Sequence, residues 1–189
     1  ETWIFKFMLF FYRIISLNRY MMFPQKGIKC NCEPPLNRFY RAIYILFSVL
    51  IALIISSLLG LSIGSHLEIS PWDSVKWALL IVGTGWAIHI LLSAILLKTN
   101  KMYDYLGQLS SIMVAGVLVL LPGILLWWMP MNVFLIIIGL SVLCSSILML
   151  KMHFERAKSL ELKTFWPIAW FVFLQAGAVF WIWMFWNWQ

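Results

Sequence analysis

Long apolar runs alternate along the chain with short polar segments that contain turn residues. A membrane-crossing helix needs about 20 mostly apolar residues. The uncharged stretch 106–150 is too long for one such helix, and Pro130 divides it, because proline disfavours helix at the preceding residue and readily begins a new one. We therefore predict an all-α polytopic membrane protein with five spans, over residues 41–63, 76–97, 106–128, 131–150 and 165–186.

The amino-terminal region 1–40 has a different pattern. In residues 1–23, a helical wheel places one group of mainly polar side chains together and puts several aromatic side chains elsewhere (Thr2, Lys6, Arg13, Ser16 and Tyr20 against Trp3, Phe7, Phe10 and Phe11). A sixth span would bury Lys6 or Arg13 at a cost of about 2.5–3.5 kcal/mol each. An amphipathic helix in the membrane interface avoids that cost. We predict this interfacial helix and a cytoplasmic linker, followed by the transmembrane domain 41–189.

The basic residues are distributed asymmetrically. Of the 14 Lys and Arg residues, all but Lys76 fall on one side of the five-span arrangement. Short loops rich in Lys and Arg stay cytoplasmic. Tryptophans, which favour the membrane–water interface, gather at the opposite boundary (Trp72, Trp77, Trp127, Trp128, Trp183, Trp186 and Trp188). We expect a protein integral to a plasma membrane, the inner membrane of a bacterium, with its N-terminus cytoplasmic and its C-terminus outside.

Composition agrees with this assignment. Hydrophobic residues make up 63% of the 189 residues and charged residues 11%, against roughly 25% charged residues in soluble domains. Lipid must therefore cover much of the surface. The net charge of +7 suits anionic headgroups, and no basic module typical of nucleic-acid binding is present, so we expect no nucleic-acid partner.

Small residues recur at every fourth position in two predicted spans. They are Ser48, Ala52, Ser56, Gly60 and Gly64 in the first span, and Gly107, Ser111 and Ala115 in the third. Such rows let helix backbones approach closely in lipid. We favour packing between these two spans of the same chain, and docking of a partner subunit is the alternative.

Cys30 and Cys32 form the first candidate for redox chemistry. Neighbouring Lys26 and Lys29 would favour the reactive thiolate. However, the segment is predicted to be cytoplasmic, where thiols stay reduced, and its spacing is not that of a common redox or zinc motif. Cys144, inside the fourth span, is expected to be a small core residue.

His89 lies near the middle of the second predicted span, where an ionisable residue suggests function. Gln175 has a similar predicted depth in the fifth span, so a neutral His89–Gln175 hydrogen bond is the structural interpretation. Contact with a quinone or a haem is the functional one. Haem would need a second axial ligand at that depth. His66 and His153 are predicted in the outer and inner loops, so neither histidine matches the depth of His89. We predict no resident cofactor or metal.

The stretch from Cys32 to Arg41 includes Pro34, Asn37 and Tyr40 and resembles the membrane tail of some DCC-type thiol–disulfide oxidoreductase-like proteins. The resemblance covers about thirty residues. It implies a thioredoxin-like domain upstream of Glu1 that carries the Cys-x-x-Cys pair, so no catalytic residue carries over to this chain.

Phosphate-loop, nucleophile-elbow and His-Glu-x-x-His motifs are missing from the chain. We therefore expect a non-catalytic membrane subunit or anchor that packs against lipid and other membrane protein subunits. The alternative is the membrane part of a thiol or quinone redox system that uses Cys30 and Cys32, or His89.

Overall fold

The computed structural model describes residues 2–22 and 36–187, without the side chains of 178, 181, 182 and 184–187. All regular structure in these residues is helical. The helices are α1 (Trp3–Met22), α2 (Arg38–His66), α3 (Pro71–Leu96), α4 (Thr99–Leu118), α5 (Leu121–Leu125), α6 (Met131–Ser159) and α7 (Phe165–Asn187).

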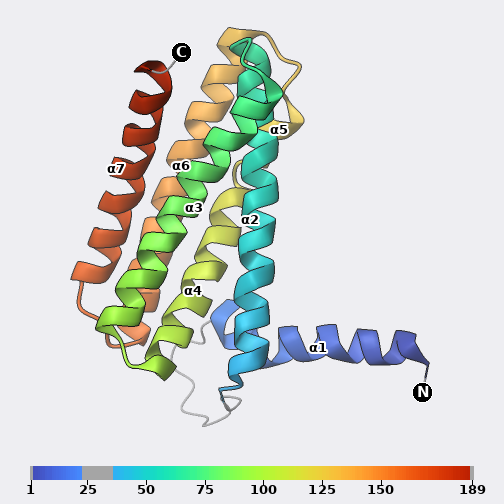
Figure 1. Cartoon of the computed structure of the whole chain (residues 1–189), viewed down its shortest axis with the longest axis vertical. Coiled ribbons are helices and arrows are strands. Elements are labelled where there is room, and N and C mark those ends of the chain that lie inside the picture. Colours follow the sequence, from blue (N-terminus) through green and yellow to red (C-terminus); the bar gives the residue numbers. More distant parts are fainter. Residues whose placement is uncertain (1, 23–35, 188–189) are drawn as a thin grey trace.

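Apart from α1 and the short α5, the helices run side by side along the length of the molecule (Figure 1). Helix α1 lies across one end of this bundle, opposite the C-terminus. Within the described residues, four stretches are long and apolar enough to cross a membrane: Arg38–His66, Pro71–Leu96, Thr99–Leu125 and Met131–Ser159. In α7, a shorter apolar stretch covers Phe165–Gly177. The predicted all-α polytopic membrane architecture is confirmed.

Local sequence explains where the helices begin. The Asn37 side chain accepts a hydrogen bond from the Tyr40 backbone N–H and caps α2. Ser70 does the same for the Asp73 N–H at the start of α3, and Pro71 occupies the first turn. Polar residues are preferred at both positions because they satisfy backbone N–H groups that have no partner inside the helix. Both helices therefore begin before the apolar runs do.

The third long apolar stretch is two helices. Its first helix, α4, ends at Leu118 and α5 begins at Leu121. Pro122 lacks the N–H that would continue the helical ladder, and its ring would clash with the carbonyl four residues earlier, that of Leu118, whereas proline is tolerated in the first turn of a new helix. The tight helical hairpin predicted at Pro130 is present, since α6 starts at the following residue.

The prediction of an inner loop from residue 151 onward was wrong. Instead, α6 continues to Ser159 and its chain reverses at Glu161, which has a positive φ of 53°. No glycine or proline interrupts residues 151–159, so the helix persists after the apolar run has ended. The change matters because His153 and Arg156 are thereby held on a helix and buried in the bundle.

The core of the bundle forms around α2 and α4. Buried Trp86, Tyr105, Leu109 and Trp170 make one cluster between α3, α4 and α7. A second cluster joins Ala52 and Ile55 of α2 to Val117 of α4. At the end where α1 crosses the bundle, Ile14 and Met21 pack against Tyr44 of α2.

Candidate functional site

The predicted row of small residues in α2 faces neighbouring helices of the same chain. Ser48, Ala52, Ser56 and Gly64 are buried. At Gly60, a side-chain Cβ would lie 2.7 Å from the Ser74 carbonyl oxygen and 2.9 Å from the Ala78 Cβ, both on α3. At Gly64, it would collide with the Ser74 side chain. The C-terminal part of this row, at Gly60 and Gly64, therefore packs against α3. The spacing of small residues in the sequence did not indicate this neighbour.

In α4, Gly107 and Ser111 are buried, whereas Ala115 is half-buried. Ser111 shares a 2.6 Å hydrogen bond with the Tyr44 hydroxyl of α2. A closer approach on the opposite side of α4 was missed: a Cβ at Gly116 would collide with Met149 of α6, and Ser145 donates to the Gly116 carbonyl at 2.9 Å. Gly116 is one residue out of step with the predicted row.

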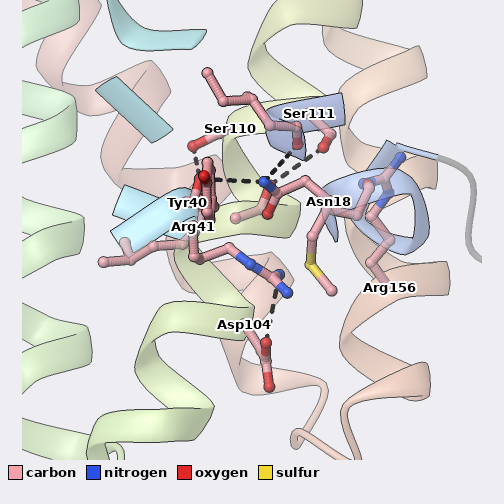
Figure 2. Close-up of polar contacts among 11 residues, drawn as sticks. Asn18, Tyr40, Arg41, Asp104, Ser110, Ser111 and Arg156 are labelled. Atoms are coloured by element: carbon pink, nitrogen blue, oxygen red, sulfur yellow. Dashed lines mark hydrogen bonds and ion pairs between the residues drawn. The ribbon is translucent and has the colours of Figure 1, made fainter. Parts of the chain in front are cut away.

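A buried polar junction joins α1, α2, α4 and α6 at the end where α1 crosses the bundle. Figure 2 shows Asn18, Arg41, Asp104 and Arg156 gathered there. Asn18 of α1 is 1% exposed. Its amide donates to the Ile14 carbonyl of its own helix at 2.7 Å and to the Tyr40 carbonyl of α2 at 3.1 Å. The second bond fixes α1 to the beginning of α2.

Arg156 reaches the same junction from α6. Its guanidinium donates to the carbonyls of Met21 and Met22, the latter at 3.0 Å, and to the Gln108 carbonyl of α4 at 3.3 Å. The last carbonyls of a helix have no partner within it and carry its negative dipole end. Buried Arg156 therefore caps the C-terminus of α1 and connects it to two other helices.

Arg41 completes the junction. It is 6% exposed, and its Nη1 lies 3.3 Å from Asp104 Oδ1 of α4. A Cβ at Gly107 would lie 2.9 Å from the Arg41 Cδ, so glycine leaves the space through which this side chain passes. The sequence predicted Arg41 and Arg156 only as basic residues of the cytoplasmic side. For Arg41, it offered one signal of pairing, the acidic Asp104 that follows Lys98 and Lys101.

The other candidate region is an interior cavity of about 230 Å³ bounded by α2, α3, α4, α6 and α7. His89 and Gln175 both line it, as their predicted depths suggested. The predicted hydrogen bond between them is not formed, since neither ring nitrogen of His89 has a hydrogen-bond partner within the part of the chain that the structure describes. His89 is 3% exposed, whereas Gln175 is exposed. The two side chains are therefore in different environments.

His153 was missed as a neighbour of this region because it was predicted in a loop. Its ring packs edge-on to Trp170 at a centroid distance of 5.1 Å, and Trp170 lies 6.3 Å from the His89 ring. Tyr105 lies 5.8 Å from His153. Neither His153 nor the Tyr105 hydroxyl has a hydrogen-bond partner among the described residues. Trp170 thus lies beside both buried histidines.

Cys30 and Cys32 lie outside the described residues. Cys144 is exposed on α6, so its prediction as a core residue was wrong. At the opposite end from α1, His66 contacts the Trp127 carbonyl at 2.7 Å and stacks on Phe134. Exposed Trp72, Trp127, Trp128 and Trp183 mark the tryptophan-rich boundary predicted from sequence.

Comparisons with known protein families, with curated proteins and with solved structures found no match for this chain.

Proposed function

We propose that this protein is an integral membrane subunit or anchor, which presents α1 along the cytoplasmic membrane interface and packs against lipid and partner membrane proteins. The attachment of α1 across the end of the bundle is the observation that carries this proposal. Asn18 and Arg156 hold its C-terminal half through buried and partly buried hydrogen bonds, so α1 is an integral part of the folded domain.

The outer surface of α1 suits an interfacial position. Its N-terminal half exposes large apolar side chains, namely Trp3, Ile4, Phe5, Phe7, Met8 and Tyr12. Lys6 and Arg13 are exposed among them. At the boundary between headgroups and acyl chains, the apolar groups can enter the bilayer while the long basic side chains extend into the headgroups.

The orientation proposed here has the N-terminus in the cytoplasm and the C-terminus outside, in a plasma membrane such as the bacterial inner membrane. Two features support it. Basic side chains gather at the end of the bundle that α1 crosses, and the exposed tryptophans other than Trp3 of α1 gather at the other end. This is the distribution expected from the positive-inside rule and the aromatic belt.

The resemblance to DCC-type membrane tails suggests a partner for this arrangement. A thioredoxin-like domain preceding Glu1 would lie on the cytoplasmic side, next to α1. The chain would then act as its membrane anchor. This proposal rests on the sequence resemblance alone.

Depth measurements test the position of α1. A spin label at Phe7 is compared with one at Ile136, an exposed residue of α6, in the full chain reconstituted in bilayers. We expect intermediate access for Phe7 to both a water-soluble nickel chelate and oxygen, and a deep, oxygen-only environment for Ile136. Equal deep burial of both labels would contradict the interfacial position.

Native mass spectrometry tests the subunit role. The full chain is extracted from its own membranes in mild detergent, and we expect a complex with a partner membrane protein at fixed stoichiometry. A monomer that retains only lipid would rule out the subunit role and leave the anchor role alone.

A further inference from the structure

The interior cavity is lined mainly by apolar side chains. They come mainly from α3, α4, α6 and α7 and include Ile81, Val82, Leu109, Met113, Val142 and Leu174, whereas α2 contributes Ser56. No Lys, Arg, Asp or Glu is among the described residues that line it. Because burying an unpaired charge is costly, this lining favours a neutral, largely apolar occupant.

Two hydrogen-bonding side chains in the wall lack partners. Trp86 and His89 both line the cavity, and they are 5% and 3% exposed. Among the described residues, neither the Trp86 Nε1 nor either His89 ring nitrogen has a hydrogen-bond partner. They lie three residues apart on α3, a spacing that puts side chains on the same helix face. A buried polar group without a partner costs about 1–3 kcal/mol, so an occupant that supplies partners is favoured.

The hydrogen-bonding chemistry of Trp86 and His89 favours an occupant that carries a hydrogen-bond acceptor. A tryptophan indole only donates, and a neutral imidazole donates through one nitrogen. A carbonyl oxygen can accept from either. The nitrogens are covered by neighbouring side chains in the wall, and rotation about the terminal imidazole torsion, which is broad, would bring the His89 N–H to an occupant.

The cavity also has a suitable size and opening. An apolar cavity of about 150 Å³ holds benzene, so about 230 Å³ accommodates one substituted six-membered ring. Val142 and Gln175 line the cavity and are themselves exposed on the outer surface of the bundle. A hydrocarbon tail can therefore leave between helices directly into lipid.

We propose that this cavity binds the head of a lipid-soluble quinone, with a ring carbonyl accepting from both His89 and Trp86, the ring beside Trp170, and the tail directed into the bilayer. The proposal concerns binding and includes no electron-transfer step. It extends beyond the anchor role, since an anchor needs no interior ligand.

Competitive photolabelling tests this binding site in the full chain reconstituted in bilayers. A photoreactive azidoquinone is the probe, decylubiquinone is the competitor, and dodecylbenzene is a competitor of similar shape without a carbonyl. We expect labelled peptides from α3 and α7, with labelling displaced by decylubiquinone and not by dodecylbenzene. Equal displacement by dodecylbenzene, or labelling that does not saturate, would overturn the proposal.

Variants locate the hydrogen bonds. We expect Trp86→Phe and His89→Leu each to weaken decylubiquinone binding by about tenfold, which is the loss of one good hydrogen bond. Trp72→Phe, at an exposed tryptophan in the first turn of α3, should bind like the unaltered protein. Thermal unfolding checks that each variant folds. Since Trp86→Phe keeps the aromatic ring, it tests the hydrogen bond even if His89→Leu fails to fold. Unchanged affinity for decylubiquinone in Trp86→Phe and in any folded His89→Leu would also overturn the proposal.

Discussion

At the scale of single residues, the most informative side chains are polar ones in buried positions. Arg156 is 4% exposed and serves three backbone carbonyls from two other helices. A guanidinium can do this because its donors are arranged in a fixed planar fork. The contacts identify Arg156 as a structural connector of α1 and α4.

Replacing Arg156 with methionine tests this role. Arg156→Met keeps a long apolar side chain but leaves the carbonyls at the end of α1 without donors, so we expect a loss of about 1–3 kcal/mol in the free energy of unfolding. Faster hydrogen–deuterium exchange in the C-terminal half of α1 should accompany it. Lys158→Met makes a similar change at an exposed position of the same helix and should alter neither quantity. If both variants behaved alike, Arg156 would not fix α1.

At the scale of helices, small residues determine how closely the elements approach. Gly60 and Gly64 of α2 lie directly against Ser74 and the α3 backbone around it. Without a hydrophobic driving force between helices in lipid, close packing of this kind contributes strongly to association. The close α2–α3 contact is possible because glycine has no Cβ at these two positions.

Gly60→Ala should therefore push the two helices apart. Its Cβ would meet a backbone carbonyl at 2.7 Å, which no rotamer change can relieve, and we expect a destabilisation of about 1–3 kcal/mol. Gly83→Ala is the matched control on α3, because nothing lies within 4 Å of its Cβ and alanine favours helix over glycine. Unfolding in mild detergent, measured for both variants, distinguishes them. Equal stability would mean that the helices readjust without cost.

At the scale of the whole molecule, the two ends of the bundle differ in chemistry. One end carries α1 and the buried arginine junction, and the other carries the exposed tryptophans other than Trp3 of α1. Arg41 and Arg156 are buried at the α1 end, yet Lys98, Lys151 and Lys158 stay exposed there and Lys101 is half-buried. The asymmetry that determines orientation is therefore retained.

Reporter fusions check the orientation in cells. Alkaline phosphatase, which is active only outside the cytoplasm, is joined after Gln189 or, in a second fusion, after Glu161 in the turn between α6 and α7. We expect activity from the first fusion and none from the second, because the basic segments hold that turn in the cytoplasm. The reverse result would invert the proposed topology.

The amino-acid sequence by itself determined the helical class, the positions of the apolar runs and the chemical difference between the two ends. These properties follow from local composition, since a lipid-facing helix must be apolar over most of its length. Proline at 130 placed the hairpin between α5 and α6 for an equally local reason. The extension of α6 to Ser159 was not predicted, because polar residues after 150 mark the end of the apolar span but can still continue the helix.

Only the tertiary structure decided which polar residues are buried together. Arg156 and Met21 are far apart in the chain but hydrogen-bonded in the fold, and His153 reaches the neighbourhood of His89 through Trp170. Such contacts depend on the rotation and relative height of neighbouring helices, which side-chain packing sets. For the same reason, His89 and Gln175 could be placed at one depth from sequence, although the hydrogen bond predicted between them does not form.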